Sequence, residues 1–348
     1  MGLQFTVTQP SELPSVRQFL LKTFAADPDL NSFRPEVLEW KYFAPHPDWD
    51  GPRSYLLKDG GTIVAHASAW PIRICAAGPE VRGIHLLDWA ASKTNPGAGL
   101  YILRKIAEMG DVLIGIGGSS YTREILPKFG YKKGGAFRRY VYVARPWQQI
   151  LTSRGYNWKT PLRFIRNAAS RLKRIPSPPS NWKTEKVLRF ESSLVSILDR
   201  GASAVRPRSL RTAAALNYML DCPAAEFSGY VISDAQQVRG YFVLAKVGRQ
   251  ARIAEIQNHA AHSSDWAPIC SIAAHTACED PRVSEVIVGT SRVEIGESFE
   301  RIGFWTRRIE PIFYYDWRKR MDPNVRFELS FLDNDFSFFY NPQNPYIS

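Results

Sequence analysis

The feature that most constrains the fold of this chain is a strand–turn–helix–strand–helix pattern between Gly83 and Tyr131. Its first part, Ile84 to Ala91, is a short and mostly apolar run, which is typical of a buried strand. The turn Pro96-Gly97-Ala98-Gly99 follows, and apolar residues then recur at helical spacing from Leu100 onward. A second apolar strand and a second short helix complete the stretch. This order predicts alternating strands and helices around a shared sheet.

A glycine turn that leads into a helix is a potential anion site. Gly97 and Gly99 carry no side chains to shield the backbone amides of the turn. The positive end of the helix dipole points toward the same place, so a pyrophosphate would fit there. Two glycines in a loop also occur in plain turns. The residues alone leave both interpretations open.

The whole order, which ends in Phe129-Gly130-Tyr131, resembles the coenzyme A-binding core of the GNAT acyltransferase superfamily. The resemblance covers about residues 3–145, and Thr94 stands where the family usually carries Arg or Gln. It implies an acyl-coenzyme A co-substrate, such as acetyl-coenzyme A, with its pyrophosphate on the loop amides and its pantetheine arm along the preceding strand. The residues that the resemblance places at this site are Trp89, Ala90, Ala91, Pro96, Gly97, Ala98, Gly99, Leu100, Ser119, Ser120 and Tyr121. Ser120 is expected to cap the second helix.

The second half of the chain repeats motifs of the first half in the same order. Asp111 to Gly115 has a counterpart in Glu285 to Gly289, and Lys128 to Tyr131 has one in Arg301 to Phe304. Duplication of a whole domain explains such a repeat, and chance similarity between two α/β segments is the alternative. Between Gln257 and Trp266 the second repeat has no glycine. Its pyrophosphate loop is therefore expected to be degenerate.

These observations predict an α/β (α+β) fold with two tandem GNAT-like domains. Each domain is expected to hold a mixed, mostly antiparallel twisted sheet flanked by helices. The expected divisions are a coenzyme A-binding domain at 1–145, a basic linker helix at 146–185 and a degenerate second domain at 186–348.

Two acidic residues are candidates for the catalytic base. In GNAT enzymes an acid on the strand before the pyrophosphate loop often accepts the proton of the attacking amine, and Asp88 lies on that strand here. Glu255 is its counterpart in the second repeat. Both acids would serve equally well as hydrogen-bonded structural residues. The tyrosine that protonates the thiolate in many family members is replaced by Leu126, so no general acid is identified.

No metal site is expected. His259, His262, Cys270, His275 and Cys278 fit no standard zinc spacing. Asp333-Asn334-Asp335 lacks the further spaced ligands of a calcium loop and is better explained as a turn.

Positive charge is concentrated between the two repeats. Arg145 to Lys186 holds ten basic residues and one acidic residue, within a chain of net charge +12. A basic amphipathic helix there would suit a tRNA or an anionic membrane surface, and a helix docked on the domains with solvated charges is the alternative.

The sequence thus favours a cytoplasmic enzyme, at most peripheral to the membrane, that transfers an acyl group to an amine. Trp40 to Pro45 resembles a segment of tandem GNAT proteins linked to surface polysaccharides, which implies an amino sugar as the acceptor. Two alternatives stay open: an aminoacyl-tRNA-dependent transferase of the peptidoglycan-bridge type, and a non-catalytic GNAT-like binding protein. Four scattered cysteines and the lack of a signal or transmembrane segment agree with a reducing compartment.

Overall fold

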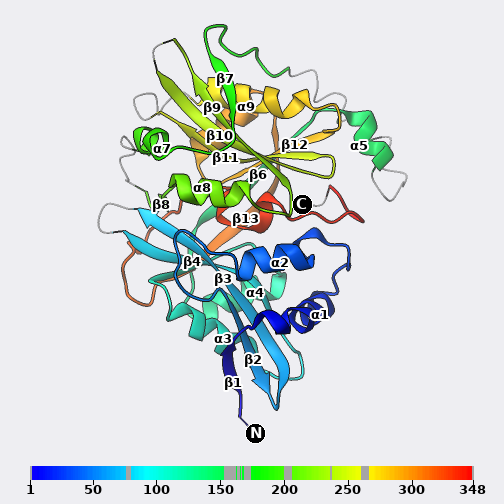
Figure 1. Cartoon of the computed structure of the whole chain (residues 1–348), viewed down its shortest axis with the longest axis vertical. Helices are drawn as coiled ribbons and strands as arrows, with labels where there is room; N and C mark the ends of the chain where they lie inside the picture. The colour runs from blue at the N-terminus through cyan, green and yellow to red at the C-terminus, as the bar shows by residue number, and fades with distance from the viewer. Residues whose placement is uncertain are drawn as a thin grey trace.

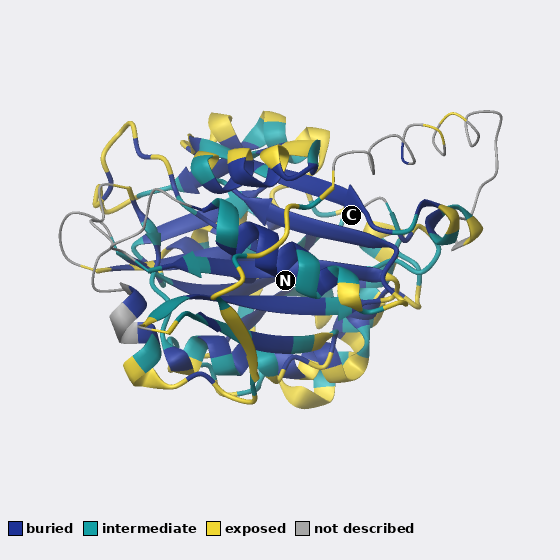
Figure 2. Cartoon of the chain, turned by 90° about the horizontal axis from the view of Figure 1, so that it is seen from above, coloured by how far each residue is buried: buried dark blue, intermediate teal, exposed yellow. Residues whose placement is uncertain are grey.

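The computed structural model describes residues 2–75, 80–152, 162, 165, 167, 174–199, 206–235, 237–259 and 266–346. Strands run through the centre of the molecule, and helices cover them (Figure 1). When the molecule is seen from above, the strands are largely buried and the helices expose their outer faces (Figure 2). This layered arrangement buries the apolar face of each helix on the sheet.

The elements of the first half from β1 to α4 lie in the lower part of Figure 1, whereas α5 lies in the upper part. Helix α1 ends at Ala25, which adopts a left-handed conformation with φ of 48°. The elements are β1 (Gln4–Val7), α1 (Leu13–Phe24), α2 (Pro35–Tyr42), β2 (Ser54–Asp59), β3 (Thr62–Cys75), β4 (Val81–Ala91), α3 (Ala98–Ala107), β5 (Val112–Ile116), α4 (Ser120–Lys128), β6 (Lys132–Val143) and α5 (Pro146–Thr152).

The second half builds the upper part and follows a similar element order. Thr212 caps α8 by accepting a hydrogen bond from the Ala215 amide at 3.1 Å. The elements are β7 (Lys183–Val187), α7 (Ser192–Asp199), β8 (Arg208–Ser209), α8 (Ala213–Leu220), β9 (Glu226–Ser233), β10 (Val238–Val247), β11 (Gln250–Asn258), α9 (Ala267–Glu279), β12 (Glu285–Thr290), α10 (Val293–Arg301), β13 (Trp305–Tyr315) and the 3-10 turns η4 (Phe331–Asp333) and η5 (Asp335–Ser337).

The strands of both halves form one continuous sheet. Within the described residues its order is β1-β2-β3-β4-β5-β13-β6-β12-β11-β10-β9-β7, and β8 pairs with β3. Strand β13 therefore lies between β5 and β6, and strand β6 lies between β13 and β12. Each half contributes its last long strand to the other half. The two halves therefore share one sheet, and their description as two tandem domains stays a prediction.

Close packing accompanies this strand exchange. A Cβ atom at Gly296 of α10 would lie 2.1 Å from the hydroxyl of Tyr140 on β6, so only glycine fits there. Arg139 of β6 donates a hydrogen bond of 2.6 Å to Glu310 of β13, and both side chains are buried. Apolar and charged contacts thus fix the exchanged strands.

The mixed α/β class with a mostly antiparallel sheet is confirmed. The division at 1–145, 146–185 and 186–348 stays a prediction, since the shared sheet crosses both boundaries. Residues 153–161, 163, 164, 166 and 168–173 of the predicted basic linker helix lie outside the described residues, as do Ser263, Ser264 and Asp265 of the second repeat.

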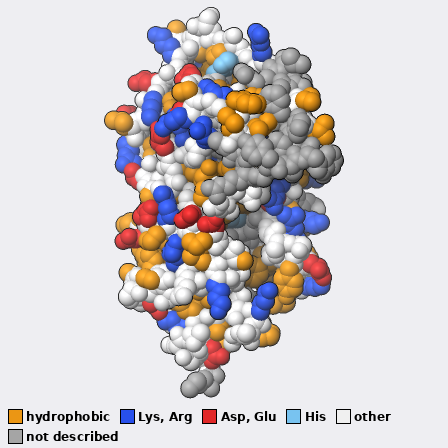
Figure 3. Space-filling view, turned by 90° about the vertical axis from the view of Figure 1, so that its right-hand side faces the viewer, with side chains coloured by type: hydrophobic (Ala, Val, Ile, Leu, Met, Phe, Trp, Pro, Cys, Tyr) orange, Lys and Arg blue, Asp and Glu red, His pale blue; other side chains and the backbone are white. Residues whose placement is uncertain are grey.

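The surface carries charges of both signs. On the face seen in Figure 3, basic and acidic side chains alternate over the described part of the chain. None of the helices in the described ranges combines the length and the apolar character that a membrane span requires. All four cysteines are free thiols.

Candidate active site

The sheet opens at two equivalent places. Parallel strands β4 and β5 pair only from Gly83 to His85 on β4, although β4 continues to Ala91. Parallel strands β11 and β12 pair only up to Ile253, although β11 continues to Asn258. Strands that diverge in this way leave a gap at their carboxyl ends, where ligands of open α/β sheets bind.

A β-bulge marks the start of each gap. Opposite β3, Asp88 and Trp89 fall between the pairs Ser68–Leu87 and His66–Ala90. In the second half Ala254 is the extra residue, directly before Glu255. Bulges re-aim side chains and interrupt the hydrogen-bonded ladder. Both predicted catalytic acids therefore lie at bulges.

The glycine turn lies beside the first gap. Gly97 precedes α3 with φ of 87° and has open space where a side chain would be. Gly99 packs closely instead: a Cβ atom there would lie 3.0 Å from the Cβ of Ala91. Glycine is therefore required at the two positions for different physical reasons. Gly97 permits the left-handed turn, and Gly99 permits α3 to approach β4.

The predicted coenzyme A residues lie together at the carboxyl ends of the parallel strands β4 and β5. Trp89 Nε1 donates a hydrogen bond of 2.9 Å to the Gly99 carbonyl and ties the end of β4 to the start of α3. Ser119 and Tyr121 follow β5 at the same edge, because β4 and β5 are parallel. The expected cap is shifted by one residue: Ser119, not Ser120, accepts the Thr122 amide at 3.1 Å.

Asp88 is buried in a polar network. It adopts a left-handed φ of 49°, which is strained for a residue with a side chain. Lys41 Nζ of α2 lies 2.5 Å from Asp88 Oδ2, and the Tyr42 hydroxyl donates to the same oxygen at 2.7 Å. The Lys41 ion pair and the Tyr42 hydrogen bond hold this carboxylate in place.

The buried His66 forms a hydrogen bond with the backbone of the bulge at Asp88. His66 Nδ1 lies 2.9 Å from the Asp88 carbonyl oxygen, which assigns the proton to this nitrogen because a carbonyl only accepts. His66 Nε2 then accepts from the Ser54 hydroxyl at 2.9 Å, and Ser54 pairs with Thr8 at 2.7 Å. Burial lowers the pKa of His66 to about 4, so the ring is neutral at pH 7.

The sequence analysis missed a third acid at this site. Asp335 lies in η5, whose Phe336 ring is covered by the Arg139 guanidinium at 4.0 Å. Burial raises the pKa of Asp335 to about 6; Lys41 opposes this shift, and the Asp88 charge adds to it. The charges of Lys41 and Asp88 thus act on Asp335, which belongs to the carboxyl-terminal segment. Its neighbourhood in sequence indicated only a turn.

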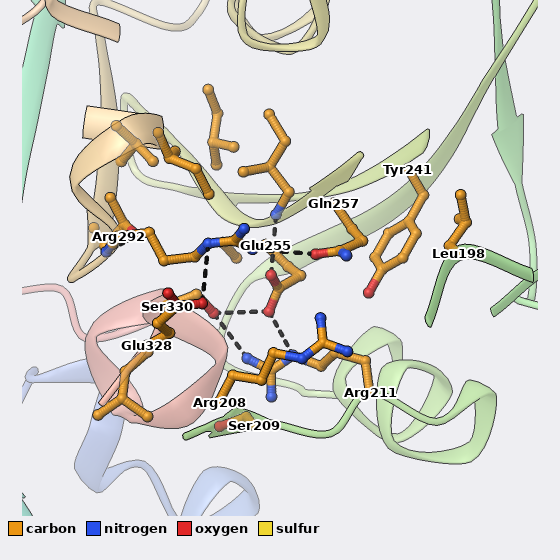
Figure 4. Close-up of a pocket in the computed structure, with 18 of the residues that line it drawn as sticks. Leu198, Arg208, Ser209, Arg211, Tyr241, Glu255, Gln257, Arg292, Glu328 and Ser330 are labelled. Atoms are coloured by element: carbon orange, nitrogen blue, oxygen red, sulfur yellow. Dashed lines mark hydrogen bonds and ion pairs between the residues drawn. The ribbon is translucent and has the colours of Figure 1, made fainter. Parts of the chain in front are cut away.

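Glu255 is part of a second network, above the second gap (Figure 4). Arg211 donates through Nε to Glu255 at 2.5 Å and through both Nη atoms to Asp333 at 2.8 and 3.0 Å. The Ser330 hydroxyl donates to Glu255 at 2.8 Å. Glu255 thus fixes Arg211 and the carboxyl-terminal segment in position.

This second network borders a pocket with a cavity of about 40 Å³. Roughly 10–15 Å³ is needed for one water, so the cavity has room for a few waters or one small polar group. Its walls include Tyr241, Gln257, Arg292, Glu328 and Ser330, together with apolar residues of α7 and α10 (Figure 4).

The structure keeps the two predicted acids apart. Within the described ranges no hydrogen bond or ion pair joins Asp88 to Glu255. The carboxyl-terminal segment reaches both networks instead, through Asp335 at the first and Asp333 at the second. No group of side chains in the described part of the chain has the composition of a metal site.

Lys41, Tyr42 and Arg211 also escaped the sequence analysis. Lys41 and Tyr42 lie in the segment quoted for its family resemblance, but nothing in the sequence indicated that they face Asp88. Leu126, which replaces the expected tyrosine, is buried, and Tyr121 is 70% exposed. The structure identifies no general acid among the predicted residues.

No protein-family model and no curated protein sequence matches the chain. Its fold is similar to several solved structures. One is a GCN5-related N-acetyltransferase from Anabaena variabilis, at 11% identity and a TM-score of 0.60 over 90% of this chain and 73% of that one. Another is the Saccharomyces cerevisiae N-myristoyltransferase with bound myristoyl-CoA, at 10% identity and a TM-score of 0.62 over 93% of this chain and 82% of that one.

A probable N-acyltransferase from Enterococcus faecalis is similar at 12% identity and a TM-score of 0.56, over 90% of this chain and 72% of that one. Sequence identities this low show a shared fold and leave the reaction to be argued from the site. The chain therefore has the GNAT fold of GCN5-related N-acetyltransferases and N-myristoyltransferase.

Proposed function

We propose that this protein transfers an acyl group from acyl-coenzyme A to a primary amine. One observation carries the proposal: the bulged end of β4 and the glycine-led start of α3 lie together at the edge where β4 and β5 diverge. A pyrophosphate would sit at the start of α3, and the thioester would lie along β4. Solved structures with this fold include transferases of that kind.

We consider two acidic residues, Asp88 and Asp335, as the base that removes the proton from the amine. A base works best when its pKa lies near the working pH, and the pKa of Asp335 is raised to about 6. Asp88 was the sequence-based candidate, and its carboxylate is held by Lys41 and Tyr42. We assign proton acceptance to Asp335, with Asp88 and Lys41 setting its charge environment.

The acceptor is proposed on sequence grounds to be an amino sugar of a surface-polysaccharide precursor. No described contact bears on this choice, and transfer from aminoacyl-tRNA likewise depends on the basic stretch outside the described residues. The engagement of Asp88 by two donors favours the third possibility, a binding protein without turnover, over a direct catalytic role for Asp88.

Acetyl-coenzyme A binding tests the proposal directly. Calorimetric titration should give one coenzyme per chain, and the ligand should raise the melting temperature because it binds only the folded state. Release of free coenzyme A in the presence of a panel of amines then measures transfer. Absence of any coenzyme binding would refute the acyl-coenzyme A-dependent transferase, whereas coenzyme binding without release would favour a binding protein without turnover.

A further inference from the structure

We propose that the pocket between β11 and β12 binds an amino-acid-type head group, meaning a carboxylate and a primary amine on neighbouring atoms. The pocket is lined by charged residues, among them Arg292 and Glu328, and by apolar residues of α7 and α10. The inference does not rest on the proposed transferase activity, because the proposed acyl acceptor is an amino sugar and not this ligand. Binding itself requires no coenzyme A.

Arg292 is the cationic partner for the ligand carboxylate. It precedes α10, and its guanidinium lies 4.5 Å above the Trp266 ring, which holds the plane in a fixed orientation. Its Nε atom is buried without a hydrogen bond and lies 3.5 Å from Glu294 Oε1 and 3.4 Å from Glu328 Oε2, and Nη1 makes a long hydrogen bond of 3.4 Å to Gln257. These contacts are long, and a planar guanidinium held so loosely is suited to a carboxylate, which accepts two parallel hydrogen bonds.

Glu328 is the anionic partner for the ligand amine. Its Oε2 atom lies 3.4 Å from Arg292 Nε, and its side chain is 13% exposed. Burial raises the pKa of Glu328, although Arg292 and Arg206 oppose the shift. The cation and the carboxylate therefore stand side by side with a loose ion pair between them. Their arrangement is the complement of a zwitterionic amino acid.

The neighbouring ion pairs are already complete. Arg211 makes hydrogen bonds of 2.5 to 3.0 Å with Glu255, Asp333 and Ser330. Releasing Arg211 would leave the buried carboxylates of Glu255 and Asp333 without this cationic partner, which is costly. Ligand exchange is therefore expected at Arg292 and Glu328, with the Arg211 network as a rigid wall.

The size and charge balance of the pocket suit a small zwitterionic head group. A cavity of about 40 Å³ admits a small group. Three arginines (Arg208, Arg211 and Arg292) and two carboxylates (Glu255 and Glu328) line it, so charges of both signs are present for a ligand that carries both. Val195, Leu198 and Ile295 supply an apolar wall for a short aliphatic side chain.

L-Alanine is the probe, measured by calorimetry and by thermal shift on the full chain without coenzyme A. We expect saturable binding, and at least tenfold weaker binding of L-alaninamide, which lacks the carboxylate, and of N-acetyl-L-alanine, which lacks the free amine. Equal binding of either analogue would overturn the proposal. So would binding of glucosamine or inorganic phosphate in place of alanine.

Variants identify the site. Arg292→Gln should lower the alanine affinity at least tenfold, and Arg292→Lys, which keeps the charge but not the planar fork, should lower it less. Arg282→Gln is the matched control, because Arg282 also pairs with an acid, is 71% exposed and lies outside the pocket. Glu328→Gln should lower affinity as Arg292→Gln does, and it serves if the latter does not fold. Unchanged affinity in folded Arg292→Gln or Glu328→Gln would overturn the assignment.

The two proposals fail separately. Saturable alanine binding that depends on Arg292 would support the head-group site even if the protein neither binds nor releases coenzyme A. Release of coenzyme A with amines by a protein that does not bind alanine would support the transferase and overturn the head-group site.

Discussion

Lys41 Nζ lies 2.5 Å from Asp88 Oδ2, and the two side chains are only 1% and 4% exposed. The pair joins α2 to the bulge of β4, and Tyr42 adds a hydrogen bond from the same helix. A charge pair this deeply buried depends on both members, because either charge alone would lack a partner in a medium of low dielectric constant.

Removal of Lys41 alone should therefore destabilise the protein. Lys41→Met leaves the Asp88 carboxylate buried with one neutral donor, and we expect a loss of about 3–5 kcal/mol in the free energy of unfolding. Urea denaturation measures it. The double variant Lys41→Met/Asp88→Asn should recover part of the loss, since it removes both charges. A single variant as stable as the parent would show that the pair contributes nothing.

The pH dependence of the proposed reaction should follow Asp335. Its pKa is raised to about 6 by burial, so the carboxyl becomes an effective base only as the pH rises through this value. The rate should increase between about pH 5 and 7 and then level off. Asp335→Asn should lower the rate and abolish the rise. Asp29→Asn, at an exposed position, should keep the profile of the parent.

Acid should destabilise the protein through its buried histidines. Burial lowers the pKa of His66 and His85 to about 4 and of His46 to about 3, against 6.5 for an exposed ring. Between about pH 4 and 6.5 the unfolded chain binds these protons and the folded chain does not. The free energy of unfolding should thus decrease as the pH is lowered through this window, by at most about 1.4 kcal/mol per pH unit for each histidine.

The contribution of one histidine is measurable as a slope. His66→Gln should reduce the steepness of stability against pH in this window, because one fewer proton is taken up on unfolding. Urea midpoints at pH 7.5, 6 and 5 give the slope independently of any constant loss of stability. A slope equal to that of the parent would show that His66 does not titrate differently in the two states.

The role of the glycine turn is testable at Gly97. The position has φ of 87° and open space for a side chain, and Asn tolerates this conformation better than most residues. Gly97→Asn should keep coenzyme A binding, and the nearly isosteric Gly97→Asp should weaken it at least tenfold by repelling the pyrophosphate. Gly99 is unsuitable for this test because a side chain there would collide with Ala91. Equal affinities of the two variants would mean that no phosphate lies at the turn.

The packing of α10 on the exchanged strand β6 predicts that the effects of substitutions at Gly296 and Tyr140 on stability depend on each other. Gly296→Ala would place a methyl group 2.1 Å from the Tyr140 hydroxyl, and we expect a loss of about 1–3 kcal/mol in the free energy of unfolding. Tyr140→Leu should relieve this clash, so the double variant should lose less than the sum of the two single variants. A double-mutant cycle from urea denaturation measures the coupling. Additive losses would contradict the packing of α10 on β6.

The sequence by itself determined the local order of the chain. Apolar runs, glycine turns and helical spacing predicted β4, α3, β5 and α4 in nearly their observed positions, because these signals lie within a few residues of one another. The mixed α/β class followed from that order and is confirmed. The predicted coenzyme A residues meet at one sheet edge because adjacent parallel strands end on the same side.

Only the tertiary structure decided which distant residues meet. The exchange of β6 and β13 depends on which strand pairs across the centre of the sheet, and no local periodicity encodes that choice. The carboxyl-terminal segment folds back between the halves. It thereby brings Asp335 within the electrostatic influence of Lys41 and Asp88, and it brings Glu328 into an ion pair with Arg292. Charge pairing in a buried site depends on three-dimensional neighbours, so the partners of Asp88 and Glu255 could be found only in the folded chain.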